Sequence, residues 1–414
     1  MFALVSMLTI IAMILGACQR APAEDKLEIF SWWTTGGEAA GLNAMYEIYK
    51  KDHANTEIVN ATVAGGAGSN AQAVLASRMQ GGDPPDSFQV HMGHELIDTW
   101  VVADKMENLD DLYQSEGWVN LFPKGVLDIV SFEGHYYSVP ANIHRANVMW
   151  YNTATFQQLG IAAAPKTFDE WFAMAETCKA AGLPALALGD SGPWTSVHLF
   201  ETVLIGTLGA EGYKGLWTGA TAWSDPMVTT ALETMDRMLD YVNSDHAALS
   251  WDQANQLVID GKACTTIMGD WVDADNLAKK FAASGWAPAP GNEGIYDALS
   301  DSFGLPKGAK HSDQAKDWLR LVGSKAGQEA FNPVKGSICA RTDCDPNLFG
   351  PYLQSAMEDW KTDTVVPSLA HGAAAKSGWV QTITDAINRF VTERDVASTQ
   401  SGLATACVDA GVCK

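Results

Sequence analysis

Two short motifs have residue types and spacing that occur in enzyme sites. Residues 66–71 (GAGSNA) match the G-x-G-x-x-A pattern of dinucleotide-binding turns, and residues 94–98 (HELID) approach the H-E-x-x-H pattern of zinc proteases. The first motif follows the second predicted strand, so a flexible glycine turn before a helix is the simpler interpretation. The second motif lacks its last histidine, and a zinc site would have to borrow His91. We therefore predict no catalytic residue, no metal and no cofactor.

A different set of side chains gathers at the ends of predicted strands. Trp32 and Trp33 directly follow a strand at 26–30, while Gln89 and His91 share one face of a strand at 87–91. In open α/β sheets, ligands bind outside the carboxyl ends of the strands. Indoles pack on the C–H faces of a sugar, and amides and imidazoles bond its hydroxyls. This favours a small-ligand site, with tryptophan packing in the core or between lobes as the alternative.

The elements that must position these residues alternate between strands and helices. Strands are predicted at 26–30, 57–63 and 87–91. Between them, Leu42, Met45, Tyr46 and Tyr49 recur at helical spacing, and Ser69 is suited to cap a second helix. This βαβαβ order predicts a largely parallel sheet with right-handed crossovers.

The rest of the chain is predicted to be mostly helical, with no internal repeat and no flexible linker. Two α/β lobes joined by short crossings fit this organisation better than separate domains on a string. The expected helices are 168–181, 197–208, 227–242 and 251–258, and the expected strands are 185–188 and 263–268.

Composition excludes several classes of function. The 414 residues are 47% hydrophobic, which is enough for a large core and excludes a disordered chain. With 49 acidic and 27 basic residues the net charge is -22, which disfavours binding to nucleic acid or to an anionic membrane surface. Fifteen tryptophans outnumber both phenylalanine and tyrosine, so some indoles are expected to do more than pack.

The first 23 residues have the features of an export signal. Residues 2–15 form an apolar run of signal-peptide length, shorter than a membrane span. Residues 15–18 (LGAC) resemble a lipobox with Cys18 as the candidate for lipidation, whereas cleavage after Ala23 would follow an A-x-A pattern. Both alternatives predict an extracytoplasmic protein, which is tethered to the membrane by a lipid on Cys18 in the first case and free in the second.

Six further cysteines agree with an oxidising compartment. The close pairs Cys339/Cys344 and Cys407/Cys413 are the predicted disulfides. Cys178 and Cys264 remain open, because a pair and two buried free thiols are equally compatible with the sequence.

Several segments, in order along the chain, resemble the solute-binding proteins of ABC sugar importers, and most closely their glucose/mannose-binding branch. These segments are 27–38 (LEIFSWWTTGGE), 82–86 (GDPPD), 89–91 (QVH), 267–271 (IMGDW), 300–304 (SDSFG) and 333–337 (PVKGS). Together they span nearly the whole mature chain.

The resemblance implies a periplasmic-binding-protein-like α/β fold with two lobes, about three hinge crossings and a ligand cleft between the lobes. The crossings would fall near residues 139–140, 301–302 and 337–340. The implied first lobe is 24–139 plus 303–339, and the second is 140–302 plus 340–414. Residues 1–23 form the signal region.

The resemblance also implies a ligand site and roles for its residues. Tryptophan would stack on the sugar ring, Asp301 and Glu38 would accept hydrogen bonds from hydroxyls, and Lys335 and His371 would donate them. The implied contacts are Trp32, Trp33, Glu38, Gln89, His91, Trp251, Trp271, Asp301, Lys335 and His371.

The implied function is a monomeric receptor that binds a monosaccharide, glucose first, closes around it and delivers it to ABC transporter permease subunits. No enzymatic activity is expected. The alternative is a secreted glycosidase or lyase that uses carboxylates of the same cleft.

Overall fold

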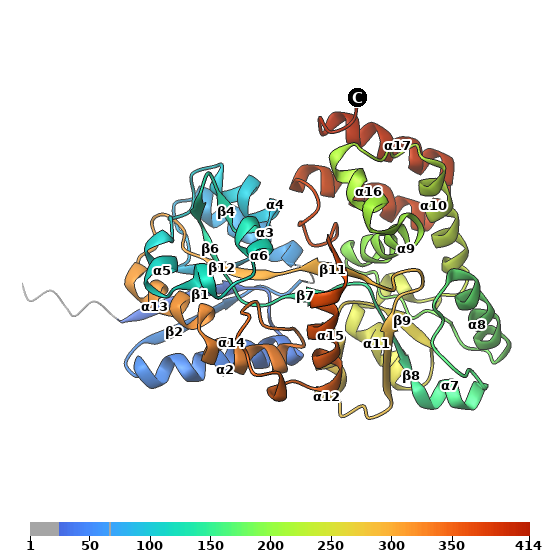
Figure 1. The fold of residues 1–414 in the computed structure, drawn as a ribbon, viewed down its shortest axis with the longest axis horizontal. Coiled ribbons are helices and arrows are strands. Elements are labelled where there is room, and N and C mark those ends of the chain that lie inside the picture. Colours follow the sequence, from blue (N-terminus) through green and yellow to red (C-terminus); the bar gives the residue numbers. More distant parts are fainter. Residues whose placement is uncertain (1–24, 66–67) are drawn as a thin grey trace, which may run out of the picture.

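The computed structural model describes residues 25–65 and 68–414, and its elements form two groups side by side (Figure 1). The predicted export signal, with Cys18 and Ala23, lies outside these residues, as do Gly66 and Ala67 of the GAGSNA motif. Among the residues described, no helix is both long and apolar enough to cross a membrane.

A five-stranded sheet in the order β2-β1-β3-β12-β6 organises the first group. β1 pairs in parallel with β2 and β3, which confirms the predicted βαβαβ unit, whereas β12 runs antiparallel to β3 and β6. The register places Asp301 of β12 opposite His91 of β3. The bounds are β1 Lys26–Ser31, β2 Glu57–Thr62, β3 Ser87–His91, β6 Ser138–Pro140 and β12 Asp301–Gly304.

The helices of this group bury apolar side chains between themselves and the sheet. In α2 (Gly36–Asp52), the four side chains predicted to share a face, at positions 42, 45, 46 and 49, are all buried. α14 (Lys325–Lys335) packs on α2, and α13 (Ser312–Gly323) packs on β1, β6 and β12. Such burial contributes about 25 cal/mol per Å² of apolar area, which makes this layer the main support of the sheet. α3 spans Ser69–Gln80.

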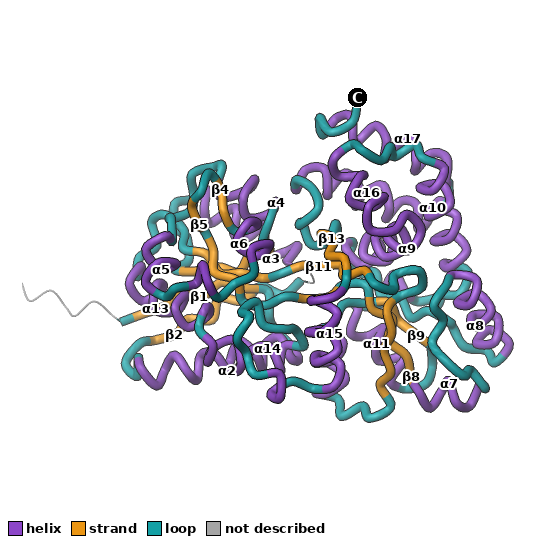
Figure 2. Tube along the Cα trace, viewed as in Figure 1, coloured by secondary structure: helices purple, strands orange, loops and turns teal. Residues whose placement is uncertain are grey.

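The second group is mainly helical around two three-stranded sheets, ordered β10-β8-β9 and β13-β11-β7. α9, α10, α16 and α17 pack together, at the upper right of Figure 2. The bounds are β7 His144–Arg145, β8 Val148–Asn152, β9 Thr265–Ile267, β10 Ser284–Pro288, β11 Ile295–Leu299, β13 Thr364–Pro367, α7 Thr153–Leu159, α8 Phe168–Ala180, α9 Trp194–Thr218, α10 Pro226–Leu239, α11 Trp251–Ile259, α12 Trp271–Ala278, α15 Pro351–Thr362, α16 Ser377–Glu393 and α17 Val396–Asp409.

Two of the predicted elements differ from the structure. The helix expected at 197–208 is the first part of α9, which continues to Thr218 across a non-helical Gly209 with φ of 70°. A glycine adopts this conformation without the strain of a side chain, so the chain turns there and resumes. The strand expected at 185–188 is reduced to bridges of Leu186 with Val242 and Thr265.

The chain passes between the two groups at three places. It leaves the five-stranded sheet after β6 and enters β7, and it returns where β11 is followed by β12. A third passage follows α14, where Ile338 forms a bridge with Ile143. The lobe limits at residues 139 and 302 fall inside β6 and β12, and the lobe division stays a prediction.

All six cysteines that follow the signal region are paired. The predicted disulfides Cys339–Cys344 and Cys407–Cys413 are confirmed. The open question at Cys178 and Cys264 is answered by a third disulfide, which joins α8 to the start of β9.

The remaining elements are short. They are α4 His94–Leu96, η2 Ile97–Val101, α5 Asp110–Ser115, η3 Trp118–Asn120, α6 Lys124–Ile129, β4 Ser131–Phe132, β5 His135–Tyr136, η4 His246–Ala248 and η5 Pro346–Leu348.

Candidate ligand-binding site

A cavity lies where the two groups of elements meet. Nine of the ten side chains predicted from the sequence line it, together with three that were not predicted. The lining residues are Trp32, Trp33, Glu38, His91, His144, Trp194, Trp251, Trp271, Leu299, Asp301, Lys335 and His371.

Both groups contribute to the cavity wall. From the first come the residues after β1, the first turn of α2, the end of β3, the start of β12 and the end of α14. β1 and β3 are parallel neighbours, so the residues at their carboxyl ends meet at one edge of the sheet. The second group contributes the starts of α9, α11 and α12, strands β7 and β11, and the segment after β13.

Indole rings form the apolar walls. Trp271 packs edge-on against Trp194 and Trp251, with ring centroids 6.0 and 6.5 Å apart. Trp32 lies over His91 at 4.9 Å. Trp33 is only 1% exposed and packs on Phe303 and Phe331, so most of its ring belongs to the core while one part reaches the cavity. These walls suit the apolar faces of a small ligand.

Asp301 is the best-supported acceptor in the cavity. Its Oδ1 accepts from Gln89 Nε2 and its Oδ2 from Asn142 Nδ2, both at 2.8 Å. Burial by itself would raise the pKa of Asp301, but His91 and Lys335 lower it below its ordinary value. Asp301 is therefore held as an anion in a fixed orientation.

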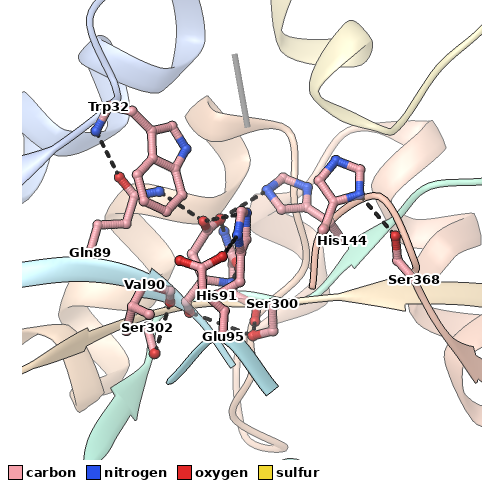
Figure 3. A network of polar contacts seen from close by, with 12 residues as sticks. Trp32, Gln89, Val90, His91, Glu95, His144, Ser300, Ser302 and Ser368 are labelled. Carbon is pink, nitrogen blue, oxygen red and sulfur yellow. Dashed lines mark hydrogen bonds and ion pairs between the residues drawn. The ribbon is translucent and has the colours of Figure 1, made fainter. Parts of the chain in front are cut away.

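Gln89 is the predicted contact that does not line the cavity. It lies behind Asp301, donating to the carboxylate, and its Oε1 accepts from the backbone N–H of Trp32 at 3.2 Å (Figure 3). Both hydrogen-bonding groups of this side chain are used inside the protein. Gln89 thus ties two lining residues together.

Lys335 brings a buried positive charge into the cavity. Its side chain is 2% exposed, and its Nζ lies 3.3 Å from Glu38 Oε1 and 3.1 Å from His144 Nε2. Burial raises the pKa of Glu38, and the attraction of Lys335 offsets part of that effect. A buried ammonium group is stabilised when its N–H donors have acceptors. Lys335 has three donors and contacts Glu38 and His144, so one donor is left for an acceptor on a ligand.

His144 was not predicted, and Asp270 explains its orientation. Its Nδ1 hydrogen bonds to Asp270 Oδ1, while the other oxygen of Asp270 accepts from the backbone N–H of Arg145 at 2.9 Å. The carboxylate fixes the proton on Nδ1, which leaves Nε2 to accept from Lys335. Burial holds the pKa of His144 well below its ordinary value, so the ring is neutral.

The two histidines that the sequence placed near the sheet edge form local pairs. His91 Nδ1 lies 2.7 Å from Glu95 Oε2, and His94 Nδ1 lies 2.6 Å from Asp98 Oδ2. Burial disfavours the charged form of His91, but Glu95 and Asp301 outweigh this and raise its pKa. The HELID segment thus pairs once within itself and once with the last residue of β3.

One group among the described residues has side chains close enough to hold a metal ion: His198, Glu201 and His371. Both oxygens of Glu201 already accept hydrogen bonds, from Ser368 and from the backbone of Leu369 and Ala370. The oxygens of Glu201 are therefore engaged within the protein.

Trp194, His144 and Leu299 are the lining residues that the sequence did not reveal. For Trp194 a signal existed, because α9, α11 and α12 each begin with a tryptophan: Trp194, Trp251 and Trp271. His144 and Leu299 lie beside the passages between the groups, and no local pattern marks them.

Comparison with known proteins gives a consistent assignment. A family model described as bacterial extracellular solute-binding protein matches residues 30–329. An uncharacterized ABC transporter extracellular-binding protein of Pyrococcus horikoshii is 37% identical over 381 residues, covering 90% of this chain and 85% of that protein. A probable sugar-binding periplasmic protein of Brucella suis is 31% identical over 397 residues, covering 91% of both.

Among solved structures, the bacterial solute receptor AcbH, described as having an exclusive preference for β-D-galactopyranose, has a TM-score of 0.83 at 19% identity. The match covers 94% of this chain and 99% of that chain, and it confirms the predicted fold.

The chain belongs to the bacterial extracellular solute-binding proteins. These are non-enzymatic receptors, so the expectation of binding without catalysis is confirmed and the glycosidase or lyase alternative is wrong. The extracytoplasmic location is likewise confirmed.

The finer resemblance to the glucose/mannose-binding branch is more distant. A glucose-binding protein of Saccharolobus solfataricus, GlcS, is 24% identical over 331 residues, covering 74% of this chain and 59% of that protein. Which sugar the chain binds is therefore proposed, and not assigned from these relatives.

Proposed function

We propose that this solute-binding protein captures a monosaccharide and delivers it to the permease subunits of an ABC importer, with glucose as the first ligand to test. The cavity carries this proposal, because its lining joins indole walls to Asp301, Glu38 and Lys335. Relatives named as sugar-binding and as ABC transporter binding proteins support it. GlcS supports glucose in particular.

The proposed contacts divide by chemistry. The tryptophans at 32, 194, 251 and 271 pack on the faces of the sugar ring, which present C–H groups. Asp301 and Glu38 accept from hydroxyls, and Lys335 donates. A ring with hydroxyls around its rim and C–H groups on its faces matches both kinds of wall.

Closure of two lobes would enclose the sugar. We assign residues 24–139 plus 303–339 to one lobe and 140–302 plus 340–414 to the other, with hinges at the three passages described above. A ligand that contacts both lobes binds the closed form more tightly and so shifts the population toward it. The closed surface would be the form that the permease subunits recognise, and the receptor would act as a monomer.

Tryptophan fluorescence tests this function, since indoles line the cavity. We expect saturable changes with one monosaccharide from a panel of hexoses and pentoses at micromolar concentration or below, and recovery of intact sugar. Asp301→Ala should weaken binding at least about 100-fold, because it removes a charged acceptor and leaves Gln89 and Asn142 donors unpaired.

The matched control is Asp128→Ala, which removes an exposed aspartate paired with Lys124. It should bind like the wild type. Near-wild-type affinity in Asp301→Ala would show that the sugar does not bind at this carboxylate.

A further inference from the structure

The turn that carries His371 is anchored by a carboxylate buried in α9. Glu201 is fully buried, and its Oε2 accepts from the backbone N–H of Leu369 at 2.5 Å and of Ala370 at 2.9 Å. Its Oε1 lies 3.0 Å from the hydroxyl of Ser368. Three donors from one short segment thus converge on a single side chain of the neighbouring helix.

The direction of these hydrogen bonds follows from the groups present. The two backbone N–H donors keep Oε2 free of a proton. Burial raises the pKa of Glu201 to about 7, while the hydrogen bonds from Ala370, Ser368 and Leu369 oppose this shift. Three donors aimed at one carboxyl favour its ionised form, so Glu201 acts as the acceptor.

The hydroxyl of Ser368 then has its single hydrogen committed to Glu201. Its oxygen lies 2.9 Å from His371 Nδ1, and an oxygen that donates elsewhere can only accept here. His371 must therefore carry its proton on Nδ1. Burial holds the pKa of His371 well below its ordinary value, so the ring is neutral and Nε2 bears a lone pair.

We propose that Glu201 and Ser368 are positioning residues that fix the tautomer of His371, so that its Nε2 accepts a hydrogen bond from a ligand hydroxyl. Nε2 forms no hydrogen bond with the described residues, while the ring lines the cavity. This reverses the donor role predicted from the sequence. The ligand part of the inference rests on the proposed sugar-binding function, whereas the tautomer does not.

The competing explanation of the same cluster is a metal ion held by His198, Glu201 and His371. His198 has two ring nitrogens without a hydrogen-bond partner among the described residues. A metal bound at His371 Nδ1 would displace the hydrogen bond to Ser368. The two explanations therefore predict different states of the same nitrogen.

The test is a long-range ¹H–¹⁵N spectrum of the ligand-free protein labelled at histidine, with His371 assigned by its loss in His371→Gln. We expect a protonated Nδ1 and an unprotonated Nε2 in the wild type, unchanged by a chelator. Ser368→Ala should move the proton to Nε2, the tautomer that an unconstrained neutral imidazole prefers, while Ser368→Thr should retain the wild-type pattern.

Ser87→Ala is the control, since Ser87 is also buried and its hydroxyl donates to a backbone carbonyl in the five-stranded sheet. It should leave the His371 signals unchanged. The proposed role of Glu201 and Ser368 would be overturned if wild-type His371 carried its proton on Nε2, or if its signals changed when a chelator removed metal. Both results come from the wild type, so they hold even if the Ser368 variants fail to fold.

The ligand part is tested with the sugar that binds the wild type. Ser368→Ala should weaken its binding about 10-fold, the effect of one hydrogen bond. A monodeoxy analogue that lacks the partner hydroxyl should bind the wild type about 10-fold more weakly than the parent sugar does. It should bind Ser368→Ala with nearly the same affinity as the parent sugar. Equal losses for every analogue in both proteins would refute the acceptor role, whereas a wild type that binds no sugar would refute the proposed function and leave the tautomer result standing.

Discussion

At the level of single residues, Lys335 is the contact that balances the charges of the cavity. It lies between Glu38 and His144, and the centroids of Trp33 and Trp271 are 5.7 and 5.9 Å from its Nζ. Removing one partner of a buried ion pair leaves the other unpaired in a medium of low dielectric constant, at a cost of about 3–5 kcal/mol. The carboxylate of Glu38 would be the group left behind.

Lys335→Met should therefore abolish sugar binding and lower the stability of the protein by about 2–4 kcal/mol, less than for a fully buried pair because the Glu38 side chain is 26% exposed. Calorimetric titration and urea unfolding measure the two effects. Lys361→Met is the control, because Lys361 forms an exposed pair with Glu358 and its loss should change neither quantity measurably. Unchanged sugar affinity in Lys335→Met would mean that Lys335 is a structural residue only.

Asp273 provides a prediction about pH. It is 9% exposed, its Oδ2 has no hydrogen-bond partner in the described part of the chain, and burial together with Asp270 raises its pKa to about 7. Because the folded state keeps a proton that the unfolded state releases, stability is lost as the pH rises from about 4 toward 7. Asp273→Asn removes this loss.

The variant should match the wild type near pH 4 and exceed it by about 1–3 kcal/mol at pH 8. Urea unfolding at pH 4, 6 and 8 measures the difference, and Asp409→Asn, at an exposed position in α17, should show no such trend. A constant difference across the three pH values would contradict the assignment.

Much of the site could be predicted at this scale because strand ends and short motifs mark it. Trp32, Trp33 and His91 follow directly from the rule that ligands bind at the carboxyl ends of parallel strands. Asp301, Lys335 and His371 came from the resemblance alone. His144 could not be found, because its role depends on Asp270 and Lys335, which are 126 and 191 residues away.

At the level of elements, the starts of helices form much of the cavity wall. α9, α11 and α12 begin with Trp194, Trp251 and Trp271, and the first turn of α2 carries Glu38. The cavity therefore depends on how closely these helix ends approach one another. Helical periodicity predicts where such elements run, but it contains no information on the distance between them.

Gly37 sets that distance for α2. A Cβ at this position would lie 2.5 Å from Ala274 Cβ in α12 and 2.6 Å from the carbonyl oxygen of Val334 in α14. Gly37→Ala should cost about 1–3 kcal/mol of stability and, by moving Glu38, weaken sugar binding about 10-fold. Thermal unfolding and titration of the variant give both values.

Gly402→Ala in α17 is the matched control, because no heavy atom lies within 4 Å of its added Cβ. It should be slightly more stable than the wild type, as expected for alanine in an open helix position. If Gly37→Ala unfolds at the same temperature as Gly402→Ala, the helices α2, α12 and α14 are not closely packed at Gly37.

The disulfides differ in the length of chain that they close. Cys178–Cys264 spans 86 residues, whereas Cys407–Cys413 spans 6. The chain-entropy relation gives about 4–5 kcal/mol for the first and about 2 kcal/mol for the second. Replacing both cysteines of each pair by alanine and measuring urea unfolding should show the larger loss for Cys178–Cys264, and equal losses would contradict this.

At the level of the whole molecule, two groups of elements meet at a cavity to which both contribute side chains. Asp301 belongs to the five-stranded sheet and Trp271 to the other group, so a ligand that touches both would stabilise the closed arrangement proposed above. The βαβαβ order and the family resemblance predicted this architecture. The predicted lobe limits at residues 139 and 302 fall inside the strands β6 and β12. The sequence therefore indicated the region of each passage but not the residue at which it occurs.

Calorimetric titration of the wild-type protein with a panel of monosaccharides, followed by analysis of the sugar recovered, tests the central proposal most directly. We expect one monosaccharide, with glucose as the first candidate, to bind one to one at micromolar affinity or better and to be recovered unchanged. Absence of binding by every monosaccharide in the panel, or conversion of the sugar to a product, would contradict it.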